Sequence, residues 1–192
     1  MPPTRIPANL CANVNDWDRD MKKILAVALG ALMLAGCANN VGLNPETNVS
    51  KFDGVKTVTI QPHGADCCMS IGAFWTEKVP DMAVLNLTTY VKYMNLEGAE
   101  LRVDDKIIKL QPVDTLTKFE QMMPGDNAVN MPTSTRGFAL PLSDLKQIMT
   151  AKTSMIRLTT LSDGAIVATI KDGKNDTKAY YAMQRFLKQI PQ

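Results

Sequence analysis

Apolar and polar residues alternate along much of the chain after residue 53, and a period of two is typical of half-buried β-strands. Clusters of Pro, Gly, Asp and Ser separate these runs and favour turns. Several runs are rich in β-branched and aromatic residues, which strands prefer. The expected strands cover residues 55–60, 67–75, 82–94, 101–103, 107–110, 115–122, 137–140, 155–160 and 165–170.

Turn residues predict how some of these strands connect. Asp104-Asp105 separates two alternating runs and gives the clearest hairpin signal, and residues 162–164 (Ser-Asp-Gly) predict a second hairpin. The Pro-His-Gly sequence at 62–64 is expected to end the first strand. Gly72 is expected at a bulge, since glycine inside a strand often marks one. Residues 123–135 are expected to form a loop.

Two segments show the helical spacing of apolar residues instead. Ser143 is the expected N-cap of a short helix. Leu145, Ile148 and Met149 would lie on one face of that helix. A second helix is expected over residues 177–189, at the end of the chain. Its apolar face would hold Ala179, Met183, Phe186, Leu187 and Ile190.

Many short strands with only two helices favour an α+β fold that is mainly β. We expect an antiparallel β-sandwich or open barrel, with one short internal helix and a C-terminal amphipathic helix. Residues 53–192 would form this single β-rich domain, because their number falls in the usual range for one domain. The polar, turn-rich residues 37–52 would form a flexible tether ahead of it.

The segment before the tether shows a different pattern. Lys22 and Lys23 precede an apolar run over residues 24–34, which leads into Leu-Ala-Gly and then Cys37. A charged start, a short apolar run and small residues are the layout of a secretory signal. The uncharged run is too short to cross a hydrocarbon core, which takes about 20 helical residues. The stretch from Met21 to Cys37 resembles a bacterial lipoprotein signal peptide.

This resemblance implies that residues 21–36 are removed and that Cys37 carries acyl chains that hold the protein in a membrane. Ala38 after the cysteine implies sorting to the outer membrane, with the domain facing the periplasm. Residues 1–20 do not fit the scheme, because three aspartates directly precede the lysines. We interpret residues 1–20 as a disordered upstream extension that is not native, with translation starting at Met21.

Charge excludes one class of partner. Of 21 basic and 19 acidic residues, four and three precede Cys37, so residues 37–192 hold 17 and 16 and are nearly neutral. No basic block stands out, and this argues against nucleic acid as a partner. The charge of the chain does not exclude a protein partner within the cell envelope or attachment to the membrane through the lipid anchor.

The candidate metal ligands are His63, Cys67 and Cys68. Imidazole and thiolate groups suit zinc or copper. Adjacent strand residues point to opposite faces, so both thiols can reach one ion only where the backbone turns. Otherwise His63 lies in a loop, with one thiol buried and the other exposed. The two cysteines could also form a vicinal disulfide, remain thiols, or bridge two chains.

No catalytic constellation appears in the sequence. The chain has one histidine, and it lacks a G-x-S-x-G elbow, a phosphate-binding P-loop and a G-x-G-x-x-G turn. Asp104-Asp105 is interpreted as a turn, and residues 172–176 as a turn before a helix cap. We therefore expect no enzyme activity and no cofactor. The leading hypothesis is a lipid-anchored envelope protein with a binding or structural role, and the alternative is periplasmic copper or zinc binding.

Overall fold

The computed structural model describes residues 44–66, 68–90, 92–113, 116–122 and 131–191. Within these ranges the chain forms ten strands and two helices. The strands are β1 (Glu46–Val49), β2 (Lys56–Asp66), β3 (Met69–Thr76), β4 (Met82–Thr89), β5 (Leu96–Val103), β6 (Lys106–Pro112), β7 (Lys118–Met122), β8 (Met131–Pro141), β9 (Ser154–Thr160) and β10 (Ala165–Lys171). The helices are α2 (Leu142–Thr150) and α3 (Lys178–Gln189).

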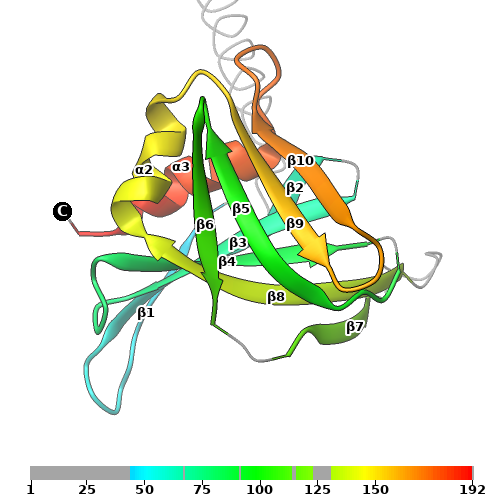
Figure 1. Ribbon diagram of the computed structural model, residues 1–192. Helices are drawn as coiled ribbons and strands as arrows, with labels where there is room; N and C mark the ends of the chain where they lie inside the picture. The colour runs from blue at the N-terminus through cyan, green and yellow to red at the C-terminus, as the bar shows by residue number, and fades with distance from the viewer. Residues whose placement is uncertain (1–43, 67, 91, 114–115, 123–130, 192) are drawn as a thin grey trace, which may run out of the picture. The chain divides into compact units, whose positions relative to one another are not determined.

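All the strands belong to one antiparallel sheet, in the order β1-β2-β3-β4-β8-β6-β5-β9-β10 (Figure 1). β7 lies off this path and pairs with the first half of β8. β6 joins β8 through two residue pairs only. This narrow contact divides the sheet into two parts. One part contains β1–β4 and β8, and the other contains β5, β6, β9 and β10. The sheet is open, and the prediction of a mainly β, antiparallel α+β fold is confirmed.

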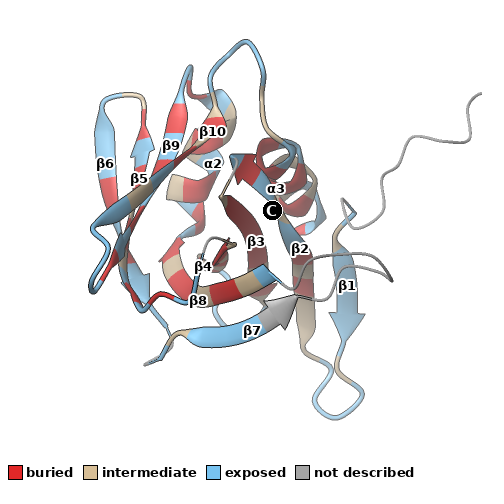
Figure 2. Ribbon diagram, turned by 90° about the vertical axis from the view of Figure 1, so that its right-hand side faces the viewer, coloured by how far each residue is buried: buried red, intermediate tan, exposed pale blue. Residues whose placement is uncertain are grey.

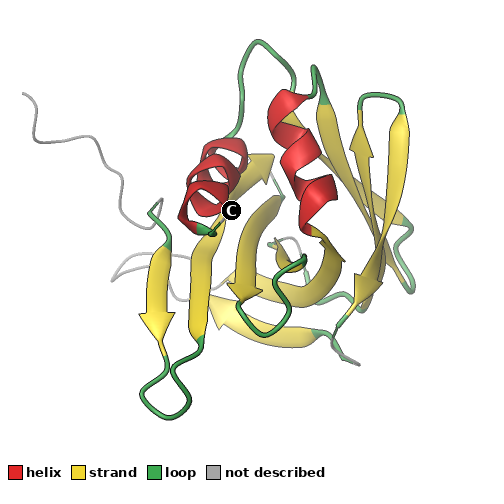
Figure 3. Ribbon diagram, turned by 90° about the vertical axis from the view of Figure 1, so that its left-hand side faces the viewer, coloured by secondary structure: helices red, strands yellow, loops and turns green. Residues whose placement is uncertain are grey.

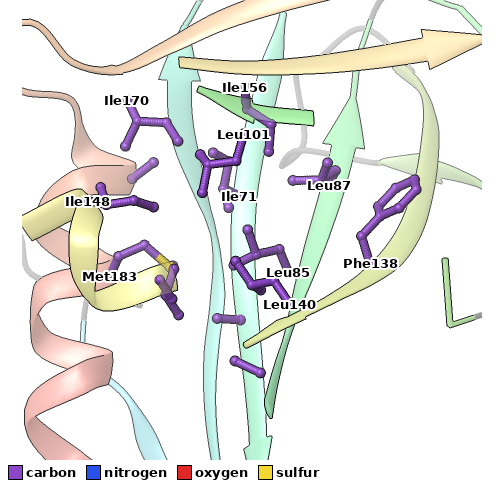
Figure 4. Packing of buried hydrophobic residues seen from close by; sticks show 14 of the residues in the cluster. Ile71, Leu85, Leu87, Leu101, Phe138, Leu140, Ile148, Ile156, Ile170 and Met183 are labelled. Atoms are coloured by element: carbon purple, nitrogen blue, oxygen red, sulfur yellow. The ribbon is translucent and has the colours of Figure 1, made fainter. Parts of the chain in front are cut away.

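The core lies between these two parts of the sheet. Alternate residues of both parts point inward, and Figure 4 shows Ile71 and Leu85 from one part near Leu101 and Ile156 from the other. Figure 3 shows both helices on the inner side of the sheet, where they cover its apolar face. Removing this apolar surface from water is the main favourable term for folding.

The two predicted hairpins and the last helix form as expected. β5 pairs with β6 across the Asp104 turn, and β9 pairs with β10 across residues 162–164. α3 begins after its N-cap Thr177, whose side chain accepts a hydrogen bond from the backbone N–H of Tyr180. Its apolar stripe packs on the core, with Leu187 only partly buried; the buried members are Ala179, Met183, Phe186 and Ile190.

The start of the first helix differs from the prediction. α2 begins at Leu142 with Pro141 as its N-cap, so Ser143 lies inside the helix and its side chain is exposed. β8 runs directly into α2, and the backbone N–H of Leu142 donates to the carbonyl oxygen of Asp81 at 2.8 Å. This long-range bond satisfies an N–H of the first turn, so no serine cap is required.

The first predicted strand does not end at Pro62. β2 continues to Asp66 by way of a bulge, in which Gln61 and Pro62 together face Gly72 of β3. The missing N–H of Pro62 is tolerated because the pairing with β1 covers only residues 56–59, at the other end of β2. The bulge expected at Gly72 is therefore present, with its extra residue on the neighbouring strand.

Three further boundaries are corrected. The predicted tether over residues 37–52 contains β1, whose four side chains are all exposed. β1 forms through backbone bonds to β2, and these leave no apolar pattern in the sequence. Residues 131–135, expected in a loop, form the start of β8 and pair with β4 and β7. The predicted strand over 82–94 ends at Thr89.

Candidate functional site

The predicted metal ligands lie around the hairpin that joins β2 to β3. His63 is half-buried in β2, opposite Ile71, and Cys68 is half-buried in the turn just before β3. The carbonyl oxygen of Cys68 accepts a hydrogen bond of 3.2 Å from the backbone N–H of Tyr90. Cys67 lies outside the described residues, so the three side chains cannot be placed together.

No group of three His, Cys, Asp or Glu side chains suitable for a metal ion occurs in the part of the chain that the structure describes. Zinc or copper binding through His63, Cys67 and Cys68 therefore stays a prediction. So does lipidation of Cys37, which lies outside the described ranges.

The outer face of β3, β4 and β8 presents a different set of polar side chains. Leu85 and Leu87 of β4 point into the core, so Asn86 and Thr88 point outward. The antiparallel register places one outward residue of each strand in a row, which β7 extends beyond β8 (Figure 1). This row is Ser70, Thr88, Thr135 and Lys118.

A groove of about 580 Å³ opens over Thr88, Thr135 and Lys118 of this row, and Ser70 lies next to it, bonded to the lining residue Tyr90. We call it the polar groove, and its wall comes from β2, β4, β7 and β8 together with Tyr90. β7 forms the exposed rim, whereas buried and half-buried residues follow one another along β8 (Figure 2). The lining residues are Gln61, Pro62, Asn86, Thr88, Tyr90, Lys118, Glu120, Thr133 and Thr135.

Hydroxyl groups at the floor of the polar groove bond to each other or to backbone. The Oγ1 atoms of Thr88 and Thr135 are 2.8 Å apart, and Ser70 and Tyr90 also share a hydroxyl–hydroxyl bond. The Oγ1 of Thr133 donates to the carbonyl oxygen of Glu120 at 2.8 Å. In a hydroxyl pair only one group donates to the other, so each pair retains one O–H that can reach a ligand.

Three of these residues are almost completely buried although they lie outside the main core, whereas Thr135 and Tyr90 are half-buried. Ser70, Thr88 and Thr133 are 2%, 5% and 3% exposed. A hydroxyl shielded from bulk water gains more from a hydrogen bond than an exposed one. The floor of the polar groove is therefore built from polar groups in fixed positions, as specific ligand recognition requires.

The rim of the polar groove carries one positive and one negative side chain. Lys118 and Glu120 are exposed and lie two residues apart on the same face of β7, so their Cβ atoms are about 7 Å apart. No ion pair joins either of them to another residue that the structure describes. The polar groove thus has no net charge, but it can contact charges of both signs.

A second hollow continues along the same face and is almost wholly apolar. This apolar pocket has a volume of about 310 Å³. Its floor is the row Phe74, Val84 and Ala139, set by the same strand register as the polar row. The lining residues are Phe74, Trp75, Thr76, Val79, Met82, Val84, Val113 and Ala139.

The other part of the sheet has a smaller hollow of about 180 Å³ on its own outer face. Ile107, Met155 and Val167 line it and are exposed, and an ion pair between Arg157 and Glu100 crosses it. Exposed apolar side chains of this kind are common at protein surfaces. The hollow lacks buried polar groups in its lining, so it is a weaker candidate than the polar groove.

Sequence reasoning did not find the polar groove. Thr88, Thr135 and Lys118 each look like ordinary residues of a solvent-facing strand side when taken alone. Only the pairing of β4, β8 and β7, which are distant in the sequence, brings them into one row. The two threonines at neighbouring outward positions of β8, Thr133 and Thr135, were a weak signal.

The helices and the comparisons with known proteins add no further candidate site. Neither described helix is long and apolar enough to cross a membrane. Comparisons of the chain with known protein families, with curated proteins and with solved structures find no match.

Proposed function

We propose that this protein is a lipid-anchored component of the cell envelope that binds a small molecule in the polar groove and does not catalyse a reaction. The observation that carries the proposal is the set of nearly buried hydroxyls at the floor of that groove. Buried polar groups cost free energy unless they have partners, and a groove that holds several of them in place is organised for recognition.

The bonding of these hydroxyls supports binding over catalysis. A nucleophilic hydroxyl needs a neighbouring base that accepts its proton. Here Thr88 bonds to Thr135, Ser70 bonds to Tyr90, and Thr133 bonds to a backbone carbonyl. None of these partners is a general base at neutral pH, whereas all of them leave capacity for a ligand.

The binding proposal is tested by native mass spectrometry of the protein purified from cell envelopes. We expect a small molecule to remain bound to the unaltered chain and to be lost from Thr135→Trp, since Trp fills the polar groove. Val167→Trp, on the outer face of the other sheet part, is the matched control and should retain the molecule. A chain that carries no molecule, or that keeps it in Thr135→Trp, contradicts the proposal.

The anchor is tested separately in cells. We expect labelled fatty acid to enter the chain and to be absent from Cys37→Ala, which would then leave the membrane fraction. Two or more acyl chains are required for stable attachment, because one alone binds only marginally. Mass spectrometry that shows residues 21–36 still attached, or an unmodified thiol at Cys37, would overturn this part of the proposal.

A further inference from the structure

We infer that the polar groove and the apolar pocket form one site for a zwitterionic phospholipid, whose head group carries a phosphate and an amine. The head group would lie in the polar groove and the acyl chain in the apolar pocket. This inference rests on the proposed binding function and names the chemical class of its ligand.

The two hollows lie in line on one face of the sheet. The polar row that contains Thr88 and the apolar row that contains Val84 are four residues apart along β4, about 13 Å. Between them lies the row Gly72, Asn86 and Gly137. Gly72 lies beneath the β2 bulge and Gly137 is buried, so the half-buried Asn86 is the accessible part of this row. An elongated molecule that contacts both hollows would cross the sheet over Asn86.

The rim charges match a zwitterionic head group. Lys118 can bind a phosphate oxygen, and Glu120 can bind an ammonium about 7 Å further along β7. The neutral O–H groups of the Thr88–Thr135 and Ser70–Tyr90 pairs supply additional donors for phosphate oxygens. A purely anionic head group would be repelled by the carboxylate of Glu120. A neutral sugar would leave the charges of Lys118 and Glu120 without partners.

The apolar pocket accounts for the acyl chain. Phe74, Val84 and Ala139 form a strip without polar atoms, and Val113 lies beside it, with its backbone N–H bonded to the Gly137 carbonyl oxygen at 3.1 Å. Val79 and Val113 are exposed in this region. Covering such a strip with a hydrocarbon chain removes apolar surface from water, which favours binding.

Trp75 gives a direct readout, because it lines the apolar pocket. The full chain with Trp17→Phe has Trp75 as its only tryptophan. The probe is a single-chain phosphoethanolamine amphiphile with a bromine on its chain, used below its micelle concentration. We expect saturable quenching of Trp75 fluorescence, because bromine quenches tryptophan at short range and the nearly buried Trp75 lies in the wall of the apolar pocket. Quenching that never saturates, or none at all, overturns the inference.

Two matched variants locate the acyl chain of the probe. Val113 is 48% exposed beside the apolar pocket, and Val167 is 54% exposed on the other sheet part. Val113→Glu should raise the dissociation constant about tenfold or more, equivalent to about 1.4 kcal/mol, and Val167→Glu should leave it unchanged. Equal effects of both variants overturn the inference. Circular dichroism checks that both variants fold.

Head-group recognition is tested with two more probes on the same chain length, one with an anionic phosphoglycerol head and one with a maltoside head. We expect the phosphoethanolamine probe to bind at least about tenfold more tightly than either. Lys118→Glu should remove this preference, while the brominated acyl chain of the probe should still quench Trp75. Equal binding of all three probes shows that the head is not recognised and overturns the inference.

The outcomes separate this inference from the proposed function. If native mass spectrometry finds a bound sugar or peptide in the polar groove, and Trp75 is not quenched, the protein binds there but the ligand class is wrong. If no molecule is found and no probe binds, both proposals fail.

Discussion

Gly72 shows how a single residue shapes the sheet beside the polar groove. A Cβ atom at this position would lie 2.9 Å from the carbonyl oxygen of Ile60 and 3.1 Å from the nitrogen of Pro62. Both atoms belong to the backbone of the β2 bulge, which cannot move aside as a flexible side chain can. Glycine is therefore required at position 72 for close approach of two strands.

We expect Gly72→Ala to lower the free energy of unfolding by about 1–3 kcal/mol, because an added methyl group must displace backbone. Gly98→Ala in β5 is the control, since a Cβ there would meet no atom within 4 Å. Its effect should stay within about 1 kcal/mol. Urea unfolding of both variants measures the difference, and equal losses would contradict the steric account.

Asp53 gives a prediction about pH. A hydrogen bond from the Lys78 ammonium, 2.8 Å from the carboxylate, and a second one from Ser50 lower the pKa of Asp53 from 3.8 to about 2. Because the folded pKa is depressed, the stabilisation is complete above pH 3.8. It is lost as the pH falls through 2.

We expect NMR titration of the Asp53 carboxyl group to give a midpoint near 2, and Lys78→Met to move that midpoint toward 3.8. A midpoint near 3.8 for Asp53 in the unaltered chain would show that the contact with Lys78 does not persist in solution.

At the scale of elements, Thr177 joins α3 to the end of β10. Its Oγ1 donates to the carbonyl oxygen of Ile170 at 2.7 Å and accepts from the backbone N–H of Tyr180 at 3.3 Å. Its own backbone N–H also donates to the Ile170 carbonyl, at 3.2 Å. One residue thus caps the helix and holds it against the preceding hairpin.

We expect Thr177→Val to lower the free energy of unfolding by about 1–2 kcal/mol, the usual cost of losing an N-cap. Thr177→Ser keeps the hydroxyl and should cost much less, which separates hydrogen bonding from packing. Thermal or urea unfolding gives both values. A larger loss in Thr177→Ser than in Thr177→Val would show that the methyl group, and not the cap, is important.

The sequence predicted the elements that have a pattern of their own. The β9–β10 hairpin and α3 were found because each buries one side at a regular spacing, with turn or cap residues at its ends. β1 was missed because all its side chains are exposed, and the start of α2 was misplaced because its first N–H bonds to Asp81, far away in the sequence. These features depend on long-range backbone bonds.

At the scale of the whole molecule, both parts of the sheet share one core. Leu158 of β9 and Leu85 of β4 belong to different parts, yet both are buried in the same cluster. We expect Leu158→Ala to cost about 2–5 kcal/mol, as for other large-to-small core changes. The loss should be registered by Trp75 in β3 as well as by circular dichroism, because the shared core predicts a single transition.

This prediction is checked by urea unfolding in a Trp17→Phe background, followed by both probes. Thr159→Ala, an exposed neighbour on the same strand, is the control and should change the free energy of unfolding by about 0.5 kcal/mol or less. Two separate transitions, with Trp75 unaffected by Leu158→Ala, would show that the two parts of the sheet unfold independently.

The sequence by itself determined the mainly β, antiparallel fold class, both hairpins and the amphipathic terminal helix, because residues a few positions apart decide these features. It also supplied the prediction of a lipid anchor at Cys37, which needs no folded structure. Only the tertiary structure decided the strand order, the placement of the extra bulge residue on β2 opposite Gly72, and the polar groove. The groove arises from register between strands that are far apart in the chain, and neither composition nor local periodicity specifies that register.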